Sequence, residues 1–94
     1  MVGKINYNGT ANAGATKQVA PNNASRTSFL FKSLGDTFVL NFGEDADADS
    51  VLTVMPNQSV FLTSNREPYE IRSKINVYCA SASAFEAQGE EFNV

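Results

Sequence analysis

Apolar and polar residues alternate in short runs along most of the chain after residue 26. Phe29 and Phe31 follow each other at a spacing of two, and residues 37–42 repeat the pattern with three more large apolar side chains. A period of two places alternate side chains on one face of a β-strand. The short turn signal at residues 34–36 lies between the two runs, which predicts that they form a hairpin.

The same pattern predicts further short strands in the second half of the chain. They are expected at residues 51–55, 58–64, 69–71 and 74–80, with Ile75, Val77 and Cys79 on the inward face of the last one. Apolar residues nowhere recur with a helical period over three turns, so we expect almost no helix. Six or seven short strands separated by turns, following one another as a meander, are typical of an all-β fold, a small antiparallel sandwich or barrel.

A single domain over residues 1–94 is expected, because a chain of this length has room for one core only. Small and polar residues dominate positions 8–25, which predicts an extended N-terminal arm over residues 1–25 with room for a short first strand. Residues 26–94 then form the sandwich core. Their last part, residues 81–94, suits either a terminal strand or an extension that clasps a partner.

Composition and charge exclude several classes of function. The 7 Lys and Arg residues against 10 Asp and Glu residues give a net charge of −3, so neither nucleic acid nor a membrane surface is expected as a partner. The absence of His removes the commonest general base and metal ligand, and a non-enzymatic protein without a cofactor is predicted. Residues 1–4 lack the apolar region of a secretory signal, which predicts a soluble protein made in a cytoplasm.

Carboxylates alternate in the acidic loop at residues 44–49, where Asp45, Asp47 and Asp49 resemble the first ligands of a calcium loop. Counting Asp45 as the first ligand, Ser50 stands where the sharp turn needs Gly, and Pro56 stands where a bidentate Glu is needed. The loop is therefore expected to be a solvated surface or a contact for a basic partner. No metal site is predicted, and these three aspartates are only weak candidates.

Two other candidate chemistries are also weak. Cys79 has no His to activate it, and its place on an apolar strand face predicts a core residue rather than a nucleophile. Glu86, Glu90 and Glu91 could supply a pair of carboxylates for glycoside hydrolysis, but a catalytic pair must flank a cleft, and these three lie together near the chain end.

Three stretches of the sequence resemble small β-rich virion proteins of tailed bacteriophages. They are residues 22–37 (NNASRTSFLFKSLGDT), 39–43 (VLNFG) and 77–80 (VYCA), within a similarity that spans roughly residues 22–92. The family is described as head decoration, cement or fibre proteins. The turns at residues 56–58 and 65–68 differ from the Gly-rich turns common in that family.

The resemblance implies a virion protein on the capsid surface, assembled in the host cytoplasm, that decorates or cements the shell by binding the major capsid protein. It also implies a homo-oligomer, a trimer at the local threefold positions of the lattice. The N-terminal arm would lie across the capsid and add a strand to an exposed sheet edge.

Two other classes remain open. One is a tail-associated or receptor-binding module that engages a glycan through the loop at residues 65–68. The other is a small enzyme. Tyr7, Tyr69 and Tyr78 are scattered along the chain, so the sequence does not indicate a platform for stacking sugars.

Overall fold

The computed structural model describes residues 2–47 and 50–92 and contains nine β-strands in this part of the chain. None of the described residues forms a helix long and apolar enough to cross a membrane. In chain order the strands are β1 (Val2–Asn6), β2 (Gly9–Ala11), β3 (Lys17–Ala20), β4 (Arg26–Ser33), β5 (Phe38–Phe42), β6 (Leu52–Val54), β7 (Ser59–Leu62), β8 (Ile75–Cys79) and β9 (Ser83–Phe92).

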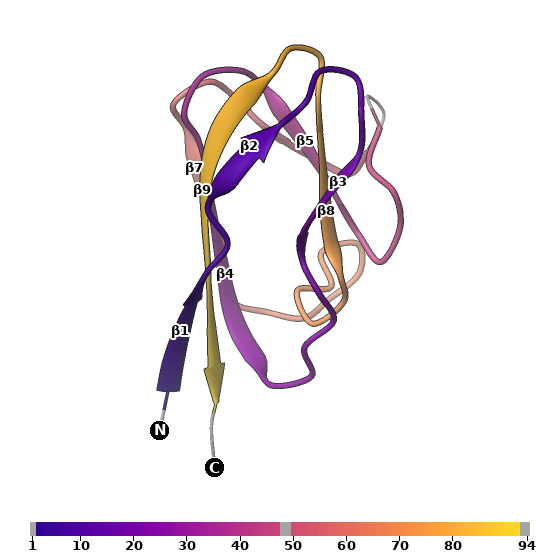
Figure 1. Ribbon diagram of the computed structural model, residues 1–94. Helices are drawn as coiled ribbons and strands as arrows, with labels where there is room; N and C mark the ends of the chain where they lie inside the picture. Colours follow the sequence, from indigo (N-terminus) through magenta and orange to yellow (C-terminus); the bar gives the residue numbers. More distant parts are fainter. Residues whose placement is uncertain (1, 48–49, 93–94) are drawn as a thin grey trace.

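The strands form two antiparallel sheets that pack face to face (Figure 1). In the five-stranded sheet the order is β1-β9-β4-β7, and β2 pairs with β9 further along the same side as β1. In the four-stranded sheet the order is β3-β8-β5-β6. Both sheets have open edges, so the all-β prediction is confirmed as a sandwich rather than a closed barrel.

The predicted hairpin between the runs at 29–31 and 37–42 is wrong. Strand β4 belongs to the five-stranded sheet and β5 to the four-stranded sheet, so the turn between them carries the chain across the sandwich. The Asp36 backbone N–H donates to Ser83 Oγ at 3.0 Å, which ties this crossing to the neighbouring crossing between β8 and β9. A period of two determines which face of a strand is buried, but it does not determine which strand is its neighbour.

The predicted N-terminal arm is also wrong as a separate feature, because residues 2–20 supply three strands of the sandwich. β1 and β2 pair with β9, and β3 pairs with β8. Strand pairing uses backbone groups, so a segment poor in large apolar side chains can still join a sheet. The strand predicted at residues 69–71 is wrong, because that segment forms turns with a single bridge between Arg66 and Tyr69. The three N-terminal strands and the loss of this one give the nine strands of the described chain.

Three phenylalanines from both sheets form the centre of the core. The Phe31 ring stacks on Phe85 with 5.3 Å between ring centroids, and Phe38 meets both rings edge-on, 5.2 Å from Phe31 and 5.6 Å from Phe85. All three side chains are buried, and so are Phe29 and Cys79, which sequence periodicity assigned to the interior. The alternation therefore predicted the buried faces of β4, β5 and β8 correctly.

One charged side chain, Arg26, is buried at the end of this core with 1% of its surface exposed. Its guanidinium donates to the backbone oxygens of Ile71 at 2.6 Å, Pro21 at 2.8 Å and Ser73 at 3.2 Å, and to the Tyr7 hydroxyl at 3.3 Å. The guanidinium also lies over the Tyr7 ring, 5.6 Å from its centroid. Arg26 thereby links the segment after β1, the segment after β3 and the loop before β8.

Candidate functional site

The acidic loop does not gather its carboxylates into a metal site in the part of the chain that the structure describes. Asp45 and Asp47 are exposed, while Ala46 between them is buried and its N–H donates to Thr16 Oγ1 at 3.0 Å. Asp49 lies outside the described residues. Among residues 2–47 and 50–92, no group of three or more potential metal-ligating side chains occurs.

Cys79 lies on the inner face of β8, fully buried, with its Sγ 3.9 Å from the Ala11 carbonyl oxygen and 3.8 Å from that of Asn12. Burial raises the pKa of the Cys79 thiol, and the nearby Asp36 carboxylate raises it further. A buried neutral thiol is a poor nucleophile. The structure thus gives Cys79 the environment of a core residue.

The glutamates of β9 are not arranged as a hydrolytic pair. Glu86 and Glu90 are four residues apart on the outer face of the strand, about 13 Å along it. Glu91 accepts a hydrogen bond from Asn23 Nδ2 at 2.7 Å. Glycosidase carboxyl groups lie about 5–9.5 Å apart across a cleft, a geometry that three residues of one strand do not provide.

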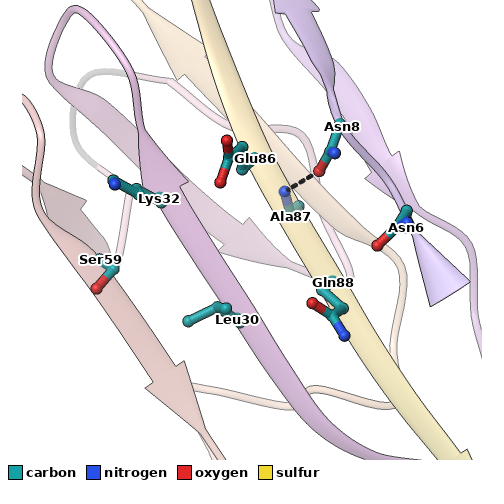
Figure 2. Close-up of a pocket in the computed structure, with 8 residues that line it drawn as sticks. All are labelled: Asn6, Asn8, Leu30, Lys32, Ser59, Glu86, Ala87 and Gln88. Atoms are coloured by element: carbon teal, nitrogen blue, oxygen red, sulfur yellow. Dashed lines mark hydrogen bonds between the residues drawn. The ribbon is translucent and has the colours of Figure 1, made fainter. Parts of the chain in front are cut away.

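A shallow hollow of about 180 Å³ lies on the outer face of the five-stranded sheet (Figure 2). The residues around it come from β7, β4, β9, the end of β1 and the segment that joins β1 to β2. They are mostly amides, hydroxyls and charged groups around one aliphatic side chain: Asn6, Asn8, Leu30, Lys32, Ser59, Glu86, Ala87 and Gln88. We call this surface, together with the neighbouring Phe61, the outer face.

Strand register places four residues of the outer face in one row across the sheet. Asn6 pairs with Gln88, Gln88 with Leu30, and Leu30 with Phe61. Phe61 is 58% exposed, the largest fraction among the exposed large apolar residues of the described chain, and Leu30 is half-buried. The row thus runs from amides at β1 to apolar groups at β7.

The charged groups of the outer face are separated. Lys32 and Glu86 are partners in the register of β4 and β9. Figure 2 nevertheless shows the Lys32 ammonium directed toward β7, away from Glu86. Both groups therefore remain accessible to a partner that approaches the sheet from outside.

Sequence reasoning missed the outer face because its residues lie far apart in the chain, from Asn6 to Gln88. It considered the loops at 44–49 and 65–68 instead. The outward positions of the strands did carry a signal, since Lys32 and Gln88 alternate with core residues, but only the strand order shows that they are neighbours. The loop at 65–68 forms a tight turn closed by a bridge between Arg66 and Tyr69.

No protein-family model matches the sequence, and no curated protein matches it either. Several solved structures share its fold. A protein of the disulfide-linked pili of Bacillus endospore appendages is 12% identical with a TM-score of 0.55, and the match covers 100% of this chain and 88% of that one. A conserved Streptococcus pyogenes protein of unknown function is 7% identical with a TM-score of 0.55, over 98% of this chain and 77% of that one.

A de novo designed double-stranded β-helix is also similar, with 15% identity and a TM-score of 0.50 over 97% of this chain and 99% of that one. Such a fold agrees with the alternation between the two sheets of the successive strands β3, β4 and β5, and of β7, β8 and β9. At these identities the similarities define the fold class, a small antiparallel β-sandwich.

Proposed function

We propose that this chain is a non-enzymatic structural protein of a tailed bacteriophage virion, which decorates the capsid shell by binding the major capsid protein. The proposal combines the resemblance of residues 22–92 to small virion proteins with the properties of the outer face. The protein would be assembled in the host cytoplasm and would reside on the capsid surface.

The observation that carries the proposal is the makeup of the outer face. Its residues project from strands whose opposite faces are locked into the core, so the surface is held rigid without a partner. Leu30 provides an apolar centre, Phe61 lies beside it at the sheet edge, and amides and charges border Leu30 on the side of the hollow. An apolar centre within a polar rim is the usual anatomy of a protein-binding surface.

The reactive side chains of the molecule also favour a role in binding over a role in catalysis. The sequence has no His, and its single Cys is buried with a raised pKa. A pilus protein of Bacillus endospore appendages shares the fold, which supports a role in assembly. The pili of that protein are disulfide-linked, whereas the buried Cys79 points to non-covalent contacts for this chain.

The test is co-sedimentation of the purified protein with emptied capsids of the phage that carries the gene. Leu30→Lys places a charge at the centre of the outer face, and Tyr78→Lys makes the same change at a half-buried residue of β8 on the opposite side of the sandwich. We expect the wild type and Tyr78→Lys to bind at saturable stoichiometry, and Leu30→Lys to bind at least ~10-fold more weakly. Failure of the wild type to bind would contradict the proposal.

A second candidate, a tail-associated or receptor-binding module that recognises a glycan, is favoured by one observation. The amides of Asn6 and Gln88 and the Glu86 carboxylate surround the hollow above Leu30. Such groups can supply the few convergent hydrogen bonds that orient a small polar ligand. Consistent hits on a glycan array that disappear in an Asn6→Ala/Gln88→Ala variant would support this candidate, and an array without hits would remove it.

A further inference from the structure

We propose that two copies of the chain pair through β7, antiparallel and about a twofold axis, so that the five-stranded sheet continues from one copy into the next. The inference goes beyond the proposed function, because it concerns contact between copies and not contact with a capsid. It follows from a difference between the two sides of the sandwich.

On one side, both sheets end in strands without charge. β6 is the edge of the four-stranded sheet and β7 the edge of the five-stranded sheet. The turn that joins them is closed by the Gln58 N–H, which donates to the Met55 carbonyl oxygen at 3.0 Å. From Ser50 to Asn65 the sequence contains no Asp, Glu, Lys or Arg. The two edges therefore form one uncharged corner, which we call the β6–β7 corner.

Three exposed apolar side chains lie on or beside these two edge strands. Val51 is 42% exposed, Met55 50% and Phe61 58%. The described residues contain only two other large apolar side chains of this kind, Leu34 and Phe92. Natural sheets protect free edges with charges, Pro or a covering segment, and an edge that lacks them is a template for another strand.

The opposite side of the sandwich carries such protection. Lys4 lies on β1 and Lys17 on β3, the edges of the two sheets there. The Lys17 ammonium donates to the Thr10 carbonyl oxygen of β2 at 2.7 Å, which joins the two edges and occupies an acceptor of β2. This contrast indicates that the chain blocks the addition of a strand at the β1 and β3 edges and permits it at the β6 and β7 edges.

Strand β7 is the edge strand whose burial and backbone hydrogen bonds a second strand would complete. Its inward residues Val60 and Leu62 are only half-buried, although they pack against the core. On β6, the inward Leu52 is likewise half-buried, whereas Val54 is 3% exposed. A second strand beside β7 would bury the remaining surface of Val60 and Leu62 and would satisfy the backbone groups of β7 that face away from β4.

A second copy fits this edge better than an unrelated strand, for reasons of charge and symmetry. Each copy has a net charge of −3, so repulsion between copies is smallest where acidic residues are absent, as they are from Ser50 to Asn65. An antiparallel edge is self-complementary, since a twofold axis pairs it with itself. In that arrangement Phe61 of one copy would lie next to Phe61 of the other, on the outer face.

Analytical ultracentrifugation of the purified chain, without capsids, tests the pairing. Phe61→Lys places a charge on the β7 edge at an exposed position, and Ser81→Lys makes the same charge change in the exposed turn between β8 and β9. We expect the wild type and Ser81→Lys to form dimers, and Phe61→Lys to dissociate at least ~10-fold more readily. A wild type that stays monomeric at about 500 μM would overturn the proposal, as would a trimer or a Phe61→Lys variant that dimerises normally.

Disulfide trapping tests the arrangement independently. Phe61→Cys copies should cross-link rapidly under mild oxidation, because paired residues on adjacent antiparallel strands have Cα atoms about 4.5–5.5 Å apart. Ser81→Cys, at another exposed position, serves as the control. Equal cross-linking rates for the two variants would overturn the twofold pairing through β7.

Discussion

The Asn8 side chain replaces a missing backbone partner of Ala87. Asn8 Oδ1 accepts a hydrogen bond from the Ala87 N–H at 2.9 Å, at the point where β1 ends and β2 has not yet begun. One residue earlier, the Tyr7 N–H donates to the Ala87 carbonyl oxygen at 2.8 Å. The central strand β9 therefore keeps its hydrogen bonds across the break, and the outer face stays continuous there (Figure 2).

Replacing Asn8 by Ala should destabilise the protein by about 1–3 kcal/mol, because the N–H of the buried Ala87 loses its acceptor. Asn8→Asp keeps an acceptor oxygen and should retain most of the stability. Urea denaturation measures both changes, and hydrogen exchange at Ala87 should accelerate in Asn8→Ala alone. Equal losses in the two variants would show that the hydrogen bond is not the cause.

Replacing Arg26 by Met should cost about 3 kcal/mol, since the carbonyl groups of Ile71, Ser73 and Pro21 lose their donor in a buried site. Arg66→Met is the matched control at an exposed position and should change stability by less than about 0.5 kcal/mol. Thermal or urea unfolding compares the two. An Arg26→Met variant as stable as the wild type would contradict the structural role of the guanidinium.

Stability should decline in alkaline solution because of Cys79. Its pKa is raised in the folded state, so the folded chain holds the thiol proton at pH values where the unfolded chain releases it. The stabilisation that comes from the protonated, buried Cys79 thiol is fully present below the ordinary thiol pKa of about 8.5. It is lost as the pH rises above that value. Urea unfolding at a series of pH values should show a smaller alkaline loss in Cys79→Ala. An identical pH dependence of stability in the wild type and in Cys79→Ala would show that Cys79 does not cause the alkaline loss.

Core and edge phenylalanines should respond differently to truncation. Phe29→Ala removes a fully buried ring and should cost about 3–5 kcal/mol. Phe61→Ala removes a ring that is 58% exposed in the single chain, and its cost in dilute protein should stay below about 1 kcal/mol. Calorimetry at low concentration compares the two, and a stable Phe29→Ala variant would contradict the inward face of β4.

The sequence was sufficient to predict the fold class and the buried faces. Phe29, Phe31, Val77 and Cys79 all lie inside, as the period of two indicates, because alternation follows directly from the pleat of a strand. The connection between β4 and β5 could not be predicted in this way. A turn within a sheet and a crossing between two sheets preserve the same alternation.

The strands of the first twenty residues could not be predicted from the sequence pattern for a different reason. Segments such as β2 contain small or polar residues, and their place in the sheet depends on backbone hydrogen bonds to β9 rather than on apolar side chains. The outer face and the β6–β7 corner are likewise properties of strand order. Charge-free residues 50–65 are visible in the sequence, but their meaning emerges only when both β6 and β7 are found at sheet edges.

A density map of the intact virion tests the central claim most directly. If the chain decorates the capsid, the sandwich will fit density on the outside of the head, with the outer face of its five-stranded sheet against the major capsid protein. Density for the chain on the tail alone, or its absence from the purified particle, would contradict the account.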